Sequence, residues 1–286
     1  MDIVSPILAW FDVHERDLPW RRTTPWGVFV SEFMLQQTPV VRVLPVWHEW
    51  MSTWPTPSAL AAAPVSDALR AWGRLGYPRR AKRLHQAATA MVDLHGGEVP
   101  ADEADLLALP GVGSYTAAAV QAFAFGRRSI VLDVNIRRVL TRVLDGQGHP
   151  AAHITKDERH QADLLWPANN AESSRWSAAV MELGALVCTA RNPQCDACPV
   201  AETCAWLATG GPLDPPSRQR PKYEGSDRQA RGMVLAHLRA STSSVTIDLL
   251  HSNWEDDAQI DRAISGLIDD GLIERTRHGR LRLAGS

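Results

Sequence analysis

Apolar residues recur every three or four positions along most of the chain, which is the spacing of one face of an α-helix. Alternation typical of a β-strand does not occur convincingly before residue 210. The fold class that this predicts is mostly α. The pattern predicts a helical region over 56–94, broken at Pro64, Gly73, Gly76 and Pro78, and further helices over 102–109, 114–125, 134–144, 157–165 and 174–187.

A polar stretch rich in Pro and Gly, 209–227, interrupts the helical pattern and is typical of a linker. Helical spacing then returns over 228–240, 245–251 and 257–270. Two short apolar runs around His278-Gly279 follow and predict a β-hairpin. Three helices and a hairpin predict an independent, winged-helix-like module at 228–286.

Composition limits the classes of protein that fit. The chain has 286 residues, of which 45% are hydrophobic, enough to bury a sizeable core. No apolar run approaches the roughly 18 residues of a membrane span. The N-terminus lacks the basic start of a signal peptide, and its apolar residues are spaced as on a helix. We therefore expect a soluble, cytoplasmic protein, with most of its tryptophans in the core.

The net charge of −2 does not by itself indicate nucleic acid, but two local runs are basic. Residues 70–83 hold six basic side chains and no acidic one, and 127–142 hold five arginines around Asp133. Charge runs are commonly solvated helix faces. Interleaved with aromatic residues and Gly-rich turns, these two also predict a surface that follows a phosphate backbone.

All four cysteines lie in one short segment, with the spacing C-x6-C-x2-C-x5-C: Cys188, Cys195, Cys198 and Cys204. Disulfides are disfavoured in a cytoplasmic protein. Four thiolates suit either zinc or an iron–sulfur cluster. Structural zinc sites usually use two close cysteine pairs, whereas this segment has one, so the spacing favours an iron–sulfur cluster with a structural role. The sequence leaves zinc open.

The segment "LALPGVGSYTAAAV", 107–120, predicts two helices joined by a Gly-x-Gly turn. Gly111 and Gly113 permit backbone angles that other residues resist and let the backbone approach a phosphate closely. The N–H groups at the start of the next helix, near Ser114, bind anions. The segment therefore predicts a helix-hairpin-helix that holds DNA without reading its sequence, with an ordinary helical turn as the alternative.

Two carboxylates stand in apolar surroundings. Glu32 lies within "VSEFMLQQTPV", where an ordinary Glu would face water. Asp133 lies in "IVLDVNIRR" at the predicted start of a helix. It is a candidate N-cap, and we expect the helix dipole and neighbouring arginines to keep it ionised.

The hairpin, the Asp and the cysteine loop occur in the order typical of the endonuclease III superfamily of DNA glycosylases. The segments "RDLPWR", "SEFMLQQT", "GRLGYPRRAKRLH", "LPGVGSYTA" and "LDVNIRRVL" closely resemble the adenine DNA glycosylases, the MutY family. The resemblance implies a helix-hairpin-helix glycosylase fold. It consists of a six-helix barrel domain at 23–127 and an iron–sulfur domain made of 1–22 and 128–208, with one [4Fe-4S] cluster on the four cysteines.

The resemblance implies removal of adenine paired with 8-oxoguanine or G in double-stranded DNA, after the base is flipped out of the duplex. Glu32 would be the general acid, with a pKa raised by an apolar pocket. Asp133 would stabilise the oxocarbenium-like sugar, and Tyr115 and Asn135 would orient the two carboxylates. Bifunctional relatives carry Lys at the position of Tyr115, so the resemblance implies a monofunctional enzyme. It also implies a monomer that acts in base excision repair and is associated with the nucleoid.

The resemblance also assigns residues that contact the two bases. Trp20 and Arg21 match the adenine pocket, Gln37 and Tyr77 match side chains that wedge into the base stack, and Thr38 and Leu75 match contacts to 8-oxoguanine. Each has a plainer structural alternative, such as a core position for Trp20 or a turn aromatic for Tyr77.

Three features depart from the family pattern. Ser177-Ala178 stand where an amide or carboxylate is common, Arg137 replaces a common Lys, and the short module at 228–286 stands where a NUDIX-like domain is usual. Two other functions compete. One is a lyase-type endonuclease acting on oxidised pyrimidines, against which Tyr115 and Glu32 argue. The other is a non-catalytic iron–sulfur protein that binds DNA, which would need neither carboxylate.

Overall fold

The computed structural model describes residues 2–212 and 222–286 and is mostly α-helical, as predicted. Part of the predicted linker, 213–221, lies outside the described residues. Within the described ranges, no helix is long and apolar enough to cross a membrane. The helices are α1 (Val4–His14), α2 (Pro25–Leu35), α3 (Val40–Thr53), α4 (Pro57–Ala62), α5 (Val65–Ala71), α6 (Arg79–His95), α7 (Glu103–Ala108), α8 (Ser114–Phe125), α9 (Val134–Leu140), α10 (Lys156–Leu165), α11 (Asn170–Leu186), α12 (Ala205–Ala208), α13 (Asp227–Ala240), α14 (Ile247–His251) and α15 (Asp257–Asp269).

The predicted helix ends agree with the local chemistry. Helix α10 begins with a capping box, in which the side chain of Thr155 accepts from the backbone of Glu158 and the Glu158 side chain accepts in return. Helices α6 and α8 end at Gly96 (φ 63°) and Gly126 (φ 60°), the left-handed conformation that glycine adopts most easily. Ser114 is the first residue of α8, and its N-cap is Gly113.

The contacts divide the chain into two compact units. Of the described residues, the first contains 2–28, 101–107 and 112–212, and the second contains 29–100, 108–111 and 222–286. Each unit is therefore assembled from segments that are distant in sequence. The domain boundaries expected from the sequence stay a prediction.

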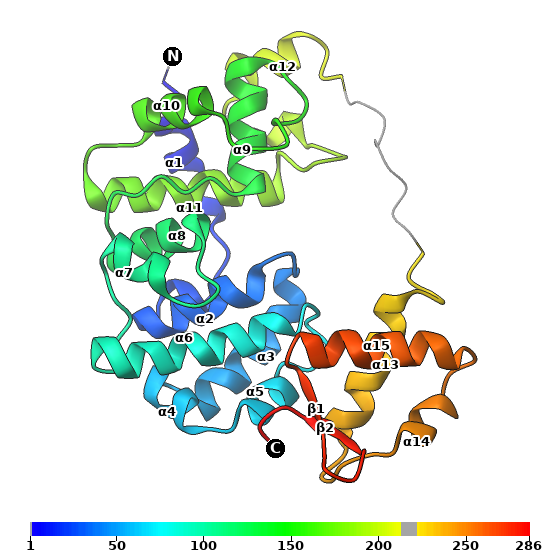
Figure 1. The fold of residues 1–286 in the computed structure, drawn as a ribbon. Helices are drawn as coiled ribbons and strands as arrows, with labels where there is room; N and C mark the ends of the chain where they lie inside the picture. The colour runs from blue at the N-terminus through cyan, green and yellow to red at the C-terminus, as the bar shows by residue number, and fades with distance from the viewer. Residues whose placement is uncertain (1, 213–221) are drawn as a thin grey trace. The chain divides into compact units, whose positions relative to one another are not determined.

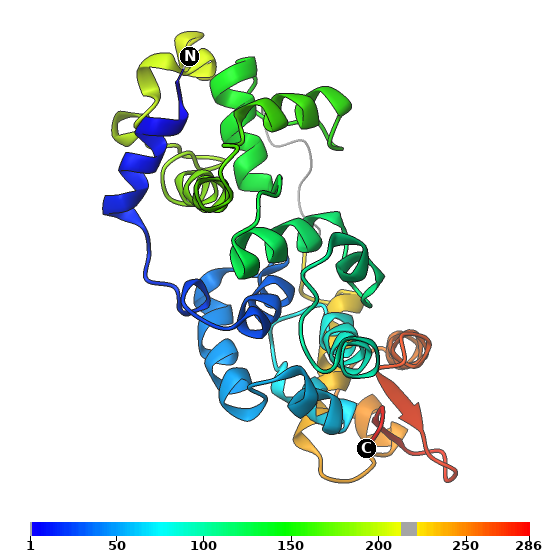
Figure 2. The ribbon, with the colours of Figure 1, turned by 90° about the vertical axis from the view of Figure 1, so that its left-hand side faces the viewer.

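The first unit is organised around α11. Helices α1 and α9 both pack against it, and Figure 2, which looks along α11, shows one on each side. Phe11, Ile136 and Leu183 bury their side chains where these helices meet. The core extends to the region of the cysteines, because Val187, Val200 and Trp206 belong to the same apolar cluster.

In the second unit, α4 and α5 lie beside α6 (Figure 1). Three tryptophans form edge-to-face pairs in its core. The ring of Trp50 lies 4.9 Å from that of Trp54 and 5.5 Å from that of Trp72, measured between centroids. Most tryptophans of the chain are buried, as expected.

The C-terminal module, 228–286, has the predicted three helices and hairpin. Helices α13 and α15 pack together, and the antiparallel strands β1 (Ile273–Arg275) and β2 (Leu281–Leu283) follow (Figure 1). Glu274 pairs with Arg282 in the register, and Val245 forms a bridge to Leu281. The turn contains Gly279 at φ 75°. These contacts confirm the winged-helix-like prediction.

Candidate active site and cluster loop

Glu32 is buried in α2, with 6% of its surface exposed. Val30, Phe33 and Met34 are each at most 1% exposed. The plain alternative, that Glu32 faces water, is therefore wrong. A carboxyl group in such surroundings is stable only with partners or as the neutral acid, and both conditions are typical of functional carboxylates.

Arg80, on α6, caps the C-terminal end of α2. Its Nη1 donates to the carbonyl oxygens of Phe33 (2.8 Å), Met34 (3.0 Å) and Gln36 (2.6 Å). The last carbonyls of a helix have no partner within the helix, and they carry the negative end of its dipole, so a cation there is favourable. Burial lowers the pKa of Arg80 to about 10, which leaves it charged at neutral pH.

The same guanidinium holds a second turn. Its Nη2 donates to Thr38 Oγ1 (2.9 Å) and to the carbonyl of Gly76 (3.2 Å). Thr38 in turn donates to the carbonyl of Leu75 at 3.2 Å. Arg80 therefore joins the turn after α2 to the loop between α5 and α6, and sequence reasoning did not identify it.

Gln37 and Tyr77 lie in these two turns, both with left-handed backbones, at φ 56° and 47°. Across the described ranges they are the only residues other than glycine with positive φ. Their side chains are exposed, that of Tyr77 by 57%, whereas Thr38 and Leu75 are buried. Strained backbones of this kind concentrate at functional sites, where surrounding contacts hold them.

Asp133 is the N-cap of α9, as predicted. Its Oδ1 accepts from the backbone N–H of Ile136 at 2.6 Å, and its Oδ2 accepts from Asn135 Nδ2 at 2.8 Å. Burial raises the pKa of Asp133, while the hydrogen bonds from Ile136 and Asn135 and the charge of Arg138 act in the opposite direction. Desolvation, the largest of these effects, therefore opposes the ionisation that we expect the helix dipole and the neighbouring arginines to favour.

The arginines after Asp133 have different tasks. Arg137 forms a bidentate pair with Glu158, at 2.5 and 2.9 Å, and so joins α9 to the first turn of α10. Arg138 donates to Asn135 Oδ1 at 2.8 Å and to the carbonyl of Cys188 at 2.7 Å. Arg138 therefore connects Asn135, the hydrogen-bond partner of Asp133, to the cysteine loop.

The hairpin glycines differ from each other. Gly111 has φ 83°, and a Cβ there would lie 2.9 Å from Cβ of Arg83 and 3.1 Å from Cε1 of Phe33. Both conformation and space require glycine. Gly113 has φ −106°, an ordinary extended backbone, and a Cβ added there would meet no atom within 4 Å. Gly113 therefore does not use the unusual angles that glycine permits, but its missing side chain leaves open space next to the start of α8.

Arg21 and Trp20 lie in the first unit. Arg21 donates to the carbonyl of Arg16 (2.7 Å) and pairs with Glu182 (3.1 Å). Glu182 is 2% exposed and also binds Arg16 through both of its oxygens. These bonds fasten the N-terminal segment to α11. Trp20 is buried. The assignment of both residues to an adenine pocket stays a prediction.

Ser177 has a structural task that its sequence position did not reveal. It is fully buried, accepts from Trp166 Nε1 at 3.0 Å and donates to the carbonyl of Ser173 at 3.1 Å. The hydroxyl satisfies the buried indole N–H of Trp166, and Trp166 packs edge-to-face on Trp176. Ala178 is partly exposed and lies against the same core.

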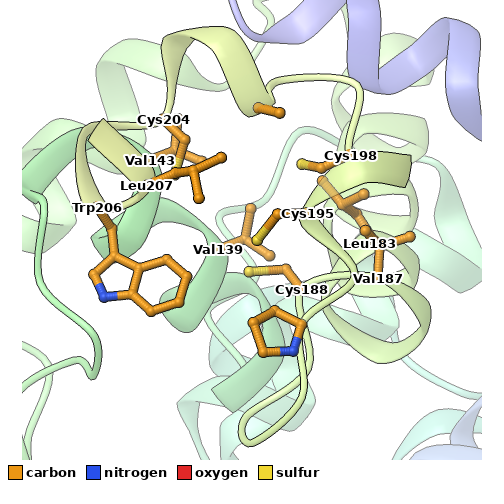
Figure 3. Close-up of a pocket in the computed structure, with 12 residues that line it drawn as sticks. Val139, Val143, Leu183, Val187, Cys188, Cys195, Cys198, Cys204, Trp206 and Leu207 are labelled. Carbon is orange, nitrogen blue, oxygen red and sulfur yellow. The ribbon is translucent and has the colours of Figure 1, made fainter. Parts of the chain in front are cut away.

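The four cysteines line one pocket, shown in Figure 3. Apolar side chains complete it, among them Val139, Leu183 and Trp206. Among the described residues, no group of three or more Cys, His, Asp or Glu side chains is arranged to hold a single metal ion, so the assignment of a cluster rests on the pocket and its four sulfur donors. Burial raises the pKa of the Cys198 thiol to about 11, so this thiol would need the positive charge of a bound cluster to bind as a thiolate.

Arg142 lies beside this pocket, in the π-helical turn Thr141–Asp145 that follows α9. It is fully buried, its Nη1 lies 3.4 Å from Cys188 Sγ, and its guanidinium stacks over Trp206 at 4.4 Å. It also donates to the carbonyls of Thr189 and Ala190, at 2.8 and 3.2 Å. The donors that hold the cysteine loop are thus supplied by a helix distant in sequence.

The candidate residues divide between the units. Glu32, Gln37, Thr38, Leu75, Tyr77 and Gly111 belong to the second unit; Trp20, Arg21, Gly113, Tyr115, Asp133, Asn135 and the four cysteines belong to the first. Tyr115 is partly buried and packs against the core of the first unit. Within the second unit, Arg80 binds the carbonyls of Gln36 and Gly76, the residues that precede Gln37 and Tyr77. Within the first unit, Arg138 binds Asn135, the partner of Asp133, and the carbonyl of Cys188.

Comparisons with known proteins agree with these features. The HhH-GPD superfamily of base excision DNA repair proteins matches residues 30–162, and the iron–sulfur binding domain of endonuclease III matches 188–204. A solved thermostable thymine-DNA glycosylase aligns with a TM-score of 0.66 at 28% identity, over 72% of this chain and 95% of its own. Fold and motifs therefore define a helix-hairpin-helix protein of base excision repair with an iron–sulfur cluster, which confirms the predicted [4Fe-4S] site.

Two relatives match almost the entire chain, the C-terminal module included. An adenine DNA glycosylase of Mycolicibacterium smegmatis is 50% identical over 287 residues, 99% of this chain and 97% of its own length. That of Mycobacterium tuberculosis strain CDC 1551 is 49% identical over 284 residues, 98% and 92% of the two lengths. The chain belongs to the adenine DNA glycosylase family.

Proposed function

We propose that this enzyme hydrolyses the N-glycosidic bond of adenine paired with 8-oxoguanine or G in double-stranded DNA, without cleaving the strand. The observation that carries the proposal is the burial of Glu32, 6% exposed inside an apolar helix of a chain that belongs to the adenine DNA glycosylases. A carboxyl group is rarely buried unless it is paired or has a chemical task, and membership of a glycosylase family favours the chemical task here.

In the proposed reaction, adenine leaves the base stack because its reacting atoms are inaccessible within the duplex. Glu32 donates a proton to N7, which makes adenine a leaving group, and the bond between the base and the sugar breaks. The electron pair of that bond stays with the base. Asp133, ionised, stabilises the positive charge that develops on the sugar, and water then adds to the sugar with loss of a proton to Glu32.

The neighbours of the two carboxylates support these roles. Asn135 fixes one oxygen of Asp133 at 2.8 Å, and the N–H of Ile136 fixes the other at 2.6 Å. Tyr115 stands where a lysine would form a Schiff base with the sugar, and a phenol has no amine for that step. This supports base release without lyase chemistry.

We assign the recognition of the opposite base to the two turns that Arg80 joins. Gln37 and Tyr77 would wedge into the stack, and Thr38 and Leu75 would set the surface against 8-oxoguanine. The exposed side chains and left-handed backbones of Gln37 and Tyr77 support the first assignment. The open space beside Gly113 at the start of α8 supports contact with the DNA backbone.

The test is single-turnover adenine release from duplexes with A opposite 8-oxoguanine, G or T. We expect release to be fastest opposite 8-oxoguanine and lost in Glu32→Gln, with Glu49→Gln, an exposed glutamate of α3, as the matched control. Borohydride should trap no adduct on abasic DNA. No release by wild-type protein holding its cluster would refute the proposal and leave a DNA-binding role, and efficient trapping would indicate a lyase.

A further inference from the structure

The C-terminal module is attached to α5 by two arginines that cap each other's helices. Arg239, near the end of α13, donates through Nε to the carbonyl of Leu69 (2.8 Å) and through Nη1 to that of Gly73 (2.6 Å). Arg70, near the end of α5, donates to the carbonyls of Leu238, Arg239 and Ser241 at 3.2, 3.0 and 2.9 Å. Each cation therefore satisfies carbonyls that a helix end leaves without partners.

A second contact joins the module to α6. The Asp270 carboxylate, 7% exposed, binds Arg79 of α6 and Arg231 of α13, and Lys82 Nζ donates to the Asp270 carbonyl at 3.2 Å. Ser66 of α5 donates to the carbonyl of Gly285 at 3.3 Å. The module thus holds α5 and α6, the two helices that flank the loop 73–77.

Side chains from outside the loop bind the carbonyls of its consecutive residues from Gly73 to Gly76. Arg239 binds Gly73, Arg42 binds Arg74, Thr38 binds Leu75, and both Trp72 and Arg80 bind Gly76. A loop with so little internal structure keeps one conformation only when its polar groups are fixed from outside. Arg239 supplies the first of these bonds and is the only donor among them that comes from the C-terminal module.

We infer that the C-terminal module supports the loop 73–77, and that its Arg239 is a positioning residue for Leu75 and Tyr77 and hence for discrimination of the base opposite adenine. The inference rests on the proposed function for the meaning of that loop. Without Arg239, the carbonyls of Leu69 and Gly73 lose their charged donor, and the loop relaxes at its first residue. A small displacement of a wedge residue is enough to change a rate strongly.

The experiment uses the full-length protein with its cluster and the variants Arg239→Gln and Arg239→Lys. Arg262→Ala is the matched control, because Arg262 is an exposed arginine of the same module whose partner lies 3.9 Å away. One readout is the ratio of single-turnover rates with A opposite 8-oxoguanine and A opposite G. The other is amide exchange across residues 73–77, which needs no activity.

We expect Arg239→Gln to lower the rate ratio about tenfold, corresponding to about 1.4 kcal/mol of discrimination, and to raise exchange in the loop. Arg239→Lys should retain part of the rate ratio and part of the protection of the loop from exchange, because it keeps the charge but cannot bridge two carbonyls. If Arg239→Gln does not fold, the rate ratio and the loop exchange of Arg239→Lys test the inference alone.

A rate ratio and loop exchange in Arg239→Gln that equal those of Arg262→Ala would overturn the inference. Equal adenine release by the wild-type protein from the 8-oxoguanine and G duplexes would overturn it too. A wild-type protein that releases no adenine from either duplex contradicts the proposed function instead. In that case amide exchange still decides whether Arg239 supports the loop, and unchanged exchange in the variant would overturn that support as well.

Discussion

Arg80 shows how one side chain fixes two backbone turns that the sequence separates widely. It bonds to the carbonyls of Phe33, Met34 and Gln36 on one side and to Gly76 on the other. A guanidinium suits this task because its donors lie in a fixed plane and diverge, whereas an ammonium is a point charge. The two strained residues Gln37 and Tyr77 are thereby held without a continuous secondary structure.

The first prediction concerns Arg80→Met, which keeps the apolar stem and removes the donors. Several buried carbonyls lose their partner, so we expect the free energy of unfolding to fall by about 3 kcal/mol. Adenine release opposite 8-oxoguanine should slow more than release opposite G. Denaturant unfolding and single-turnover kinetics measure both effects, with the exposed Arg159→Met as control. Equal slowing on both duplexes would contradict a role of Arg80 in wedge geometry.

The second prediction concerns the acid side of the pH profile. Burial raises the pKa of Asp133 above its usual value, and the Asn135 hydrogen bond lowers it. Asp133 must be ionised to stabilise the sugar cation, so adenine release is lost as pH falls through that raised pKa. Asn135→Leu removes a bond to the ionised form and should move the acid limb to higher pH. An acid limb at the same pH in the single-turnover profiles of wild type and Asn135→Leu would refute the effect of Asn135 on the pKa of Asp133.

At this scale the carboxylates, the cysteines and the proposed wedge residues could be selected from the sequence because each stands in a short motif, and the catalytic and wedge roles stay predictions. It did not identify Arg80, Arg138 or Arg142. The basic run 70–83 was expected to follow phosphates, yet Arg70, Arg79, Arg80 and Lys82 bind partners within the protein. A run of charge gives no periodic signal that separates an arginine facing solvent from one that caps a distant helix.

Helix ends were the most predictable elements, because their signals are local. Pro64 separates α4 from α5, and the Gly- and Pro-containing run from Gly73 to Pro78 separates α5 from α6, as predicted. The stretch 134–144 also continues as expected, but α9 ends at Leu140 and a π-helical turn, Thr141–Asp145, follows. That turn lies next to α12, a tertiary contact that the sequence pattern does not contain.

The third prediction concerns Asp270, which joins α6 to α13 at the end of α15. Burial opposes ionisation, but the hydrogen bonds of Arg79 and Arg231 lower the pKa of Asp270 below its usual value. A depressed carboxylate pKa stabilises the fold above the unfolded-state pKa of about 3.9, and this stabilisation is lost as pH falls through the folded-state value.

Asp270→Asn should therefore lower the melting temperature at pH 7 by about 2 to 4 °C, which corresponds to a loss of about 1 kcal/mol in the free energy of unfolding. The difference between wild type and variant should shrink as pH falls from 6 to 3. Thermal unfolding followed by circular dichroism measures it, and Asp248→Asn, an exposed aspartate of α14, is the control. A difference that does not change over this pH range would show that the ion pairs do not cause it.

At the scale of the whole molecule, the module at 228–286 has the predicted three helices and hairpin. Its contacts place 222–286 in the same compact unit as 29–100. The attachment consists mainly of side chains bound to carbonyls, and such bonds leave no hydrophobic pattern in either partner. The cysteine loop was predictable because all four ligands lie within one short segment.

The last prediction concerns removal of the cluster. The loop 188–204 is held by iron and by Arg138 and Arg142, and Arg138 also binds Asn135, the partner of Asp133. Losing the cluster should free the loop and, through Arg138, loosen the start of α9. The same apolar core buries Phe11, Ile136 and Leu183, which are not cluster ligands, and their packing should keep the helices of the first unit.

We therefore expect Cys198→Ser or oxidative loss of iron to leave the far-ultraviolet circular dichroism nearly unchanged but to abolish adenine release. Amide exchange should rise over 188–204 and 133–136 and stay unchanged over 73–77. The loop 73–77 serves as the internal reference, because its carbonyls are bound by residues of the second unit alone. An equal rise in both regions would mean that the cluster stabilises the whole chain, and the proposed path through Arg138 would then be wrong.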